Sequence, residues 1–467
     1  MHNAINRAKA AYSRMPVGIR SIAASGYGWY LRSWRYGPET ERLVAEALAR
    51  DAWSAEQWAS YQDERLAELL HRAATRVPFY RQQWSTRRAA GDRSSFEDLS
   101  NWPILRKRDV RQDPHAFLAD DVRPRQLFRL SSSGTSGTPI TTWRSRRTMR
   151  AHYALFEART RRWYGVDRSM RWAMIGGQVV TPADQVDPPF WVWNSGLKQL
   201  YLSSLHVSER NARAYLDAMH EYGVRYLLGY ASSMYWLAQF SLDRSLVAPR
   251  MDVVISNAEP LLPHQRDAIG AAFGCPVRNT YGMSEIVAGA TECEHGTLHV
   301  WPDAGVIEAV DDDGVHVPAG RTGALLCTGL LNDDMPLVRY EVEDRGALGV
   351  ARDATCACGR RLPQLEHIEG RLSDVLFTAD GRRVFWYNVQ FYDLPLREGQ
   401  LVQEEVDHIV VNVIPGDGFG PDTAALIRNR IQERLGTRRV DVNVVDAIPR
   451  AANGKFNAVL NRVAQRS

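Results

Sequence analysis

The sequence predicts an α/β protein with a large N-terminal region and a small C-terminal α+β unit. Between about residues 125 and 345, short apolar segments alternate with segments of helical periodicity, which favours a mostly parallel sheet flanked by helices. From about residue 375 onward, a strand–helix–strand pattern indicates a separate small unit. The length of 467 residues, or 52.8 kDa, leaves room for at least two hydrophobic cores.

The individual elements follow from local patterns. Residues 38–90 have apolar residues at three- and four-residue spacing, typical of helices, with a break at Val77-Pro78. We expect parallel strands at 171–177, 225–230, 251–257 and 323–329. The run from Asp311 to Gly314 predicts a hairpin turn. In the C-terminal unit, 408–414 and 440–444 alternate as strands, and 422–436 forms a helix that stops at Gly436.

Composition excludes several classes of protein. Hydrophobic residues make up 45% and charged residues 24% of the chain, which excludes a polytopic membrane protein and a disordered chain. Five cysteines are too few for a disulfide scaffold. A net charge of +4 over this length gives no reason to expect a nucleic-acid partner.

The first 70 residues predict a basic, helical arm. No acidic residue precedes Glu39, while Tyr27, Trp29, Tyr30 and Trp34 are interspersed among basic residues. The segment is too polar for a secretory leader, so we expect a cytoplasmic protein. The arm either packs on the main region, the interpretation we favour, or makes peripheral contact with an anionic membrane surface.

The densest local motif is Leu-Ser-Ser-Ser-Gly-Thr-Ser-Gly-Thr-Pro at 130–139, after a predicted strand. Glycines allow the backbone to approach a phosphate closely, and amides and hydroxyls donate hydrogen bonds to its oxygens. The Gly-Lys-Ser/Thr ending of a Walker loop is absent. Taken alone, such a loop is also consistent with a solvated turn.

Together with four later motifs, this loop resembles those of the adenylate-forming superfamily, which contains acyl-CoA synthetases and adenylation domains. The later motifs are Asn-Thr-Tyr-Gly-Met-Ser-Glu at 279–285, Arg339-Tyr340 with Asp344, Gly-Arg-Leu-Ser-Asp at 370–374, and Asn-Gly-Lys at 453–455. The branch that the chain resembles is the phenylacetate-CoA ligase family, particularly its relatives encoded with capsular polysaccharide genes. The similarity extends from about residue 70 to the end.

The resemblance implies ATP-dependent activation of a small-molecule carboxylate as an acyl-adenylate, with release of pyrophosphate, followed by acyl transfer to CoA. It implies a large domain at 71–372 and a small mobile domain at 373–467. Lys455 would be catalytic, and Glu285 would be catalytic and hold Mg²⁺. The residues implied to bind ATP are Ser132, Ser133, Gly134, Thr135, Ser136, Gly137, Thr138, Glu259, Tyr281, Gly282, Ser284, Asp344 and Arg371.

Two positions depart from the family pattern. Thr138 stands where many relatives carry lysine, which puts in doubt how strongly the loop holds pyrophosphate. Ser373 occupies a hinge position that is usually acidic or lysine. A hinge needs only to absorb backbone rotation, so the pivot is still expected.

Cysteines and a histidine form a second candidate site. Cys293, His299, Cys356 and Cys358 lie in two turn-rich segments, and three thiolates with one imidazole suit tetrahedral Zn²⁺ with no open position. His295 competes with His299 for the fourth position, and free reduced thiols are the alternative to a metal site.

The acyl pocket and the acyl acceptor are less defined. The resemblance places the carboxylate pocket near Tyr230 and Ser232, although such residues are usually core. An amine, a sugar or a carrier protein would use the same adenylation residues as CoA. A further alternative is a non-catalytic membrane-surface scaffold that retains the fold.

Overall fold

The largest sheet of the computed structural model has eight strands in the order β10-β9-β8-β7-β6-β3-β5-β4. The structure describes residues 12, 15–131, 140–178, 180–182, 184–349, 356–371, 375–378, 383–385, 394–435, 437, 439–451 and 453–463. The strands are β3 (Trp172–Gly176), β4 (Trp191–Asn194), β5 (Gln199–Ser203), β6 (Tyr226–Gly229), β7 (Val253–Ser256), β8 (Val277–Gly282), β9 (Gly289–Glu292) and β10 (Leu298–Val300). The five central strands are parallel, which confirms the predicted α/β class.

Alternating side chains of this sheet face two different helical layers. Ala173 and Ile175 pack in one cluster with α8 (Glu209–Glu221), α9 (Ala231–Asp243) and α10 (Pro263–Phe273). Trp172 belongs to a cluster on the opposite face, next to η4 (Phe156–Arg161), a π-helical turn that continues α7 (Arg146–Leu155). The period of two along a strand produces this division.

A second sheet, β11-β12-β13-β14, is antiparallel throughout. Its strands are β11 (Gly305–Val310), β12 (Gly323–Gly329), β13 (Tyr340–Leu348) and β14 (Leu365–Arg371). The prediction of a parallel strand at 323–329 is therefore wrong. No helix intervenes before this segment; the chain returns through the turn at 311–314, as predicted, and pairs directly with β11.

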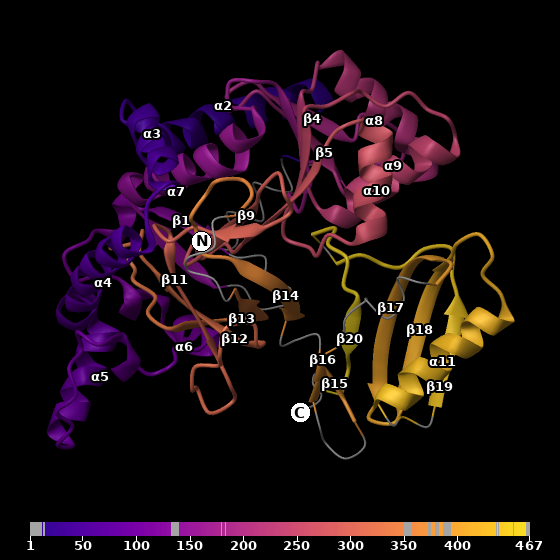
Figure 1. The fold of residues 1–467 in the computed structure, drawn as a ribbon. Coiled ribbons are helices and arrows are strands. Elements are labelled where there is room, and N and C mark those ends of the chain that lie inside the picture. Colours follow the sequence, from indigo (N-terminus) through magenta and orange to yellow (C-terminus); the bar gives the residue numbers. More distant parts are fainter. Residues whose placement is uncertain are drawn as a thin grey trace.

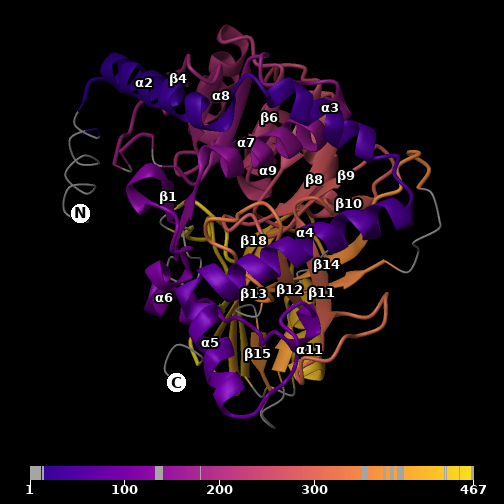
Figure 2. The same cartoon turned by 90° about the vertical axis from the view of Figure 1, so that its left-hand side faces the viewer.

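Three helices occupy most of residues 40–89. They are α3 (Thr40–Arg50), α4 (Ala55–Arg76) and α5 (Pro78–Ala89), which confirms the helical region and the break at Val77-Pro78. A capping box between Ser54 and Gln57 starts α4. Helix α4 runs through residue 70, the predicted end of the arm, and its Leu69 and Leu70 pack in the core of the second sheet. Figure 2 shows α4 crossing in front of β11–β14.

Helix α2 (Val17–Arg35) lies along β4 at the edge of the large sheet (Figure 1). The backbone N–H of Ser195 donates to Ser25 Oγ at 3.0 Å, and Leu31 and Trp34 pack with Phe128 and Met149. Helix α2 therefore packs on the main region with one side, while Ile22 and Trp29 on another side are exposed. Across the residues that the structure describes, no helix is both long and apolar enough to cross a membrane.

The C-terminal unit has its own sheet and its own hydrophobic cluster, and it lies at the lower right of Figure 1. Its strand order is β19-β18-β17-β20, from β17 (Leu396–Glu405), β18 (His408–Pro415), β19 (Arg439–Val444) and β20 (Val459–Asn461). Helix α11 (Pro421–Leu435) connects β18 to β19, which are parallel, as the strand–helix–strand pattern predicted.

The remaining elements are short. They are α6 (Lys107–Gln112), η1 (Leu99–Asn101), η2 (Pro114–Phe117), η3 (Pro124–Gln126), η5 (Arg162–Tyr164), β1 (Phe128–Ser131), β2 (Thr141–Arg144), β15 (Val375–Phe377) and β16 (Arg383–Phe385).

Candidate active site

The candidate site lies at the carboxyl edge of the large sheet. The predicted residues Tyr230 and Tyr281 lie there, as do Gly177 and Asn257, and these four residues follow or end the parallel strands β6, β8, β3 and β7. Open α/β sheets bind ligands at this edge, because the loops that leave parallel strands all emerge there.

Two of the predicted ATP-binding residues form a direct contact. The Tyr281 hydroxyl donates to Asp344 Oδ2 at 2.9 Å, which joins the large sheet to β13 of the second sheet. Asp344 is paired in register with Arg371 of β14, whose side chain lies outside the described residues. The fold therefore brings three motifs from residues 281, 344 and 371 to one place.

Glu285 lies in the turn between β8 and β9 and is only 7% exposed. The Tyr340 hydroxyl donates to its Oε1 at 3.3 Å. The Glu285 carboxylate also interacts electrostatically with the buried Arg144. Burial lowers the pKa of the Arg144 guanidinium to about 10, and the negative charge of Glu285 acts in the opposite direction. Gly282 and Ser284 are exposed beside Glu285. A carboxylate such as Glu285 is a suitable ligand for Mg²⁺.

The predicted phosphate loop, Ser132 to Thr138, lies outside the described residues. Its flanking strands are described, and β1 pairs with β2 so that Ser131 is opposite Thr141. The two ends of the loop are therefore held next to each other by an antiparallel pair.

The Glu259 carboxylate joins the large region to the C-terminal unit. One oxygen accepts from the Ser232 backbone N–H at 2.9 Å, in the first turn of α9, and the other accepts from the Phe456 backbone N–H at 2.8 Å. The predicted contact of Glu259 with ATP stays a prediction. The hydrogen bond between Glu259 and the Phe456 backbone has no sequence motif, and sequence reasoning missed it.

Lys455 lies at this junction and is 9% exposed. Gly454 has φ of +77°, and a Cβ added there would overlap the Ser204 hydroxyl. A Cβ on Gly177 would overlap the Tyr230 hydroxyl and lie 3.2 Å from the Asn453 carbonyl oxygen. Sequence reasoning missed Gly177 and Ser204, although two glycines directly after a strand are a recognisable signal of close backbone approach.

Further contacts hold the C-terminal unit against α9. Trp236 Nε1 donates to Glu398 Oε1 at 3.3 Å, and Arg450 donates to both oxygens of Glu398 at 2.8 and 3.0 Å. Arg397 pairs with Asp243 at 3.0 Å. Burial raises the pKa of Glu398, and Arg450 opposes the shift.

Buried polar atoms at the carboxyl edge are without hydrogen-bond partners. Within the described residues these include Ser232 Oγ, Ser256 Oγ and Asn257 Oδ1. An unsatisfied buried polar group is costly, so such atoms indicate a place where a polar ligand or water completes the hydrogen bonding. The residues present therefore fit a polar substrate.

The predicted metal ligands also come together. Cys293, His299, Cys356 and Cys358 each offer a ligand atom, and these atoms all lie within 4.8 Å of one another. The Sγ atoms of Cys293 and Cys356 are 3.8 Å apart, and Cys358 Sγ is 3.4 Å from His299 Nε2. The structure thus places His299 in this cluster.

These separations match the edges of a zinc tetrahedron. Zn–S and Zn–N bonds of usual length give about 3.8 Å between two sulfurs and about 3.6 Å between sulfur and nitrogen. His299 Nδ1 lies 3.3 Å from the Leu362 carbonyl oxygen, a contact that fixes the ring and directs Nε2 toward the thiols. The donor set therefore fits Zn²⁺.

Comparison with known proteins shows what the chain is similar to. Residues 382–462 match the family described as the CapK C-terminal domain. The chain is 24% identical to protein CapK of Staphylococcus aureus, covering 86% of this chain and 89% of that protein. It is 28% identical to a phenylacetate-coenzyme A ligase of Thermus thermophilus, covering 73% and 74%. The chain is a homologue of CapK and the phenylacetate-CoA ligases.

This CapK and phenylacetate-CoA ligase homologue has the fold of a solved 2-hydroxyisobutyryl-CoA ligase. The TM-score is 0.66 against its postadenylation state, at 19% identity, with 90% of this chain and 93% of that chain covered. Against the thioesterification state of the same ligase the TM-score is 0.53. The arrangement of this chain is therefore more similar to the postadenylation state.

Proposed function

We propose that the protein activates a carboxylic acid with ATP and Mg²⁺, forming an acyl-adenylate and releasing pyrophosphate, and then transfers the acyl group to CoA. Homology to AMP-forming ligases supports the acid-activating class. The observation that carries the proposal is the junction between Glu259 and the Phe456 backbone N–H, because it brings Lys455 to the carboxyl edge where the nucleotide motifs meet. We propose the cytoplasm as its location, because ATP and CoA are available there.

Each residue has a chemical role in the proposal. Asp344, oriented by Tyr281, accepts hydrogen bonds from the ribose hydroxyls, with Arg371 nearby. The loop Ser132–Thr138 supplies amides and hydroxyls to the phosphates. Glu285, held by Tyr340, would hold Mg²⁺, which supplies charge neutralisation at the phosphate oxygens.

Lys455 would stabilise negative charge between the carboxylate and the α-phosphate. Glu259 would be a positioning residue, because its carboxylate accepts from the backbone N–H of Phe456, the residue next to Lys455. Tyr230 and Ser232 would line the carboxylate pocket. Residues 373–467 would move as a unit between the two half-reactions, as the family resemblance implies.

A structural Zn²⁺ would be held by Cys293, His299, Cys356 and Cys358. It would stabilise the segments around β10 and β14, since His299 forms an isolated bridge with Gln364. Four protein ligands leave no open position, so this metal has no part in the chemistry.

Carboxylate-dependent exchange of labelled pyrophosphate into ATP tests the first half-reaction. A set of carboxylates is assayed first, and the active ones are then supplied with CoA or hydroxylamine as acceptors. Thioester formation with CoA supports the whole proposal. Exchange without thioester formation assigns transfer to an amine, a sugar or a carrier protein, and no exchange with any carboxylate supports a non-catalytic scaffold.

A further inference from the structure

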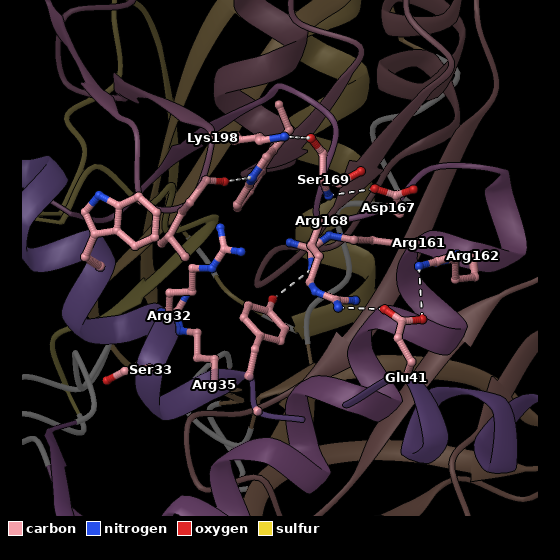
Figure 3. Close-up of a pocket in the computed structure, with 16 residues that line it drawn as sticks. Arg32, Ser33, Arg35, Glu41, Arg161, Arg162, Asp167, Arg168, Ser169 and Lys198 are labelled. Carbon is pink, nitrogen blue, oxygen red and sulfur yellow. Dashed lines mark hydrogen bonds and ion pairs between the residues drawn. The ribbon is translucent and has the colours of Figure 1, made fainter. Parts of the chain in front are cut away.

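A cavity of about 700 Å³ lies away from the candidate active site (Figure 3). It is lined by residues at the amino ends of parallel strands, including Trp172 of β3 and Lys198 before β5, and by Trp29, Arg32 and Ser33 of α2. Trp172 and Gly176 are the first and last residues of β3, which places them roughly 13 Å apart along the extended strand. The cavity and the candidate active site are therefore at opposite edges of the same sheet.

The lining of this cavity is strongly basic. Six cationic side chains face two acidic ones, Glu41 and Asp167, and the cations are Arg32, Arg35, Arg161, Arg162, Arg168 and Lys198. Glu41 pairs with Arg168 at 2.6 Å, and Asp167 accepts from the Ser169 backbone N–H at 2.6 Å. The buried Glu157 also pairs with Arg161, Arg162 and Arg168. Counted against these three carboxylates, the six cations leave an excess of three positive charges.

One of these cations is buried and incompletely hydrogen-bonded. Arg161 is 3% exposed, and its Nε has no hydrogen-bond partner; the partly buried Nε of Arg35 has none either. Arg161 lies 5.0 Å from the Trp172 ring and 5.9 Å from the Tyr226 ring, so aromatic faces and the buried Glu157 hold it in place. A fixed, desolvated guanidinium in a basic cavity is suited to binding an oxyanion such as phosphate.

The outer face of α2 next to this cavity is apolar. Ile19, Ile22, Tyr27, Trp29 and Tyr30 are 48–72% exposed. No acidic residue occurs in α2, and between Gly18 and Tyr30 its one charged residue, Arg20, is buried. Ile22 and Trp29 are seven residues apart and share a side of the helix, and Trp29 also lines the cavity. The apolar face therefore continues into the basic cavity.

We propose that this cavity binds the phosphate of an anionic phospholipid headgroup while the exposed face of α2 rests in the bilayer interface. Aromatic and aliphatic side chains on one face of a helix, next to arginines, are suited to the interface between acyl chains and headgroups. Charge complementarity identifies the occupant: the apolar face alone would suit many partners, but the adjoining cavity selects a phosphate. The candidate active site at the opposite edge of the sheet is not part of this contact.

Flotation of the full-length protein with vesicles tests the proposal. We expect binding to phosphatidylcholine vesicles that contain phosphatidylglycerol and little binding to phosphatidylcholine alone. Ile22→Ser should weaken binding about tenfold by removing an apolar anchor, and Arg32→Gln about fivefold by removing one cation near the surface. Val247→Ser and Arg210→Gln are the matched controls, since Val247 is 77% exposed and Arg210 is exposed on α8, away from the cavity; both should bind normally.

Two further measurements separate the lipid from other occupants. Glycerol 1-phosphate should compete weakly with anionic vesicles, and Arg32→Gln should reduce that competition while Ile22→Ser leaves it unchanged. Stabilisation by glycerol phosphate without vesicle binding would overturn the assignment to a lipid. A concentration-dependent dimer that Ile22→Ser dissociates would likewise overturn it, because the face would then be a contact between two copies.

Discussion

Gly454→Ala should slow acyl-adenylate formation through a defined steric overlap. Gly454 adopts φ of +77°, and its added Cβ would overlap the Ser204 hydroxyl and lie 3.0 Å from Ser204 Cβ. Alanine at this positive φ costs about 1–2 kcal/mol of backbone strain. This cost is the same whether or not the loop is docked against Ser204, as long as the loop keeps this φ. The overlap belongs only to the docked arrangement.

The expected loss of activity can therefore be estimated from the steric overlap alone. Forcing extra volume into a packed contact costs about 1–3 kcal/mol, which corresponds to a loss of about 5- to 150-fold in the docked population. Carboxylate-dependent ATP–pyrophosphate exchange should fall by that factor. Acyl transfer from a supplied acyl-adenylate should change by less than about threefold, because Lys455 is withdrawn in that step under the proposed mechanism.

Two variants make the prediction specific. Gly418→Ala is the matched control, because Gly418 also has positive φ, at +87°, but its added Cβ meets no atom within 4 Å. Ser204→Gly should partly restore exchange in the Gly454→Ala background, after allowance for its own lost hydrogen bond to the Gly176 carbonyl, about 1 kcal/mol. Equal loss of both half-reactions in a folded variant, or no rescue by Ser204→Gly, would refute the reasoning.

Other substitutions test the remaining assignments. Lys455→Ala should slow adenylation on the order of 10²- to 10³-fold and spare acyl transfer; equal loss in both steps would contradict its role. Asp344→Ala should raise the KM for ATP about 10- to 150-fold and leave the carboxylate KM nearly unchanged, as measured by steady-state exchange. Purified protein should contain about one zinc by elemental analysis, and Cys293→Ser should abolish it and lower Tm; a metal-free protein of unchanged Tm would exclude the site. Burial lowers the pKa of His152 to about 3, so between pH 6.5 and about 3 the unfolded state binds the extra proton. The free energy of unfolding should then fall with decreasing pH, by at most about 1.4 kcal/mol per unit, and His152→Gln should flatten this slope in denaturant titrations.

The sequence by itself determined the features that depend on local order along the chain. Hydrophobic periodicity gave the helices between residues 38 and 90 and the strand–helix–strand unit near the C-terminus, because these patterns need only neighbouring residues. The ordered motifs ending in Lys455 identified the family that the comparisons confirm. The four residues of the Cys/His cluster were also identifiable, since three of the five cysteines of the chain belong to it.

Tertiary structure decided what depends on contacts between distant segments. Residues 323–329 are as apolar as a parallel strand, and only their pairing with β11 makes them antiparallel. Glu259 meets Phe456 across 197 positions of sequence through a backbone amide, a group that every residue except proline carries and that leaves no sequence signal. The basic cavity likewise assembles Arg32, Arg161 and Lys198 from three separate segments. Chain folding creates these sites because it fixes distances that sequence spacing leaves undefined.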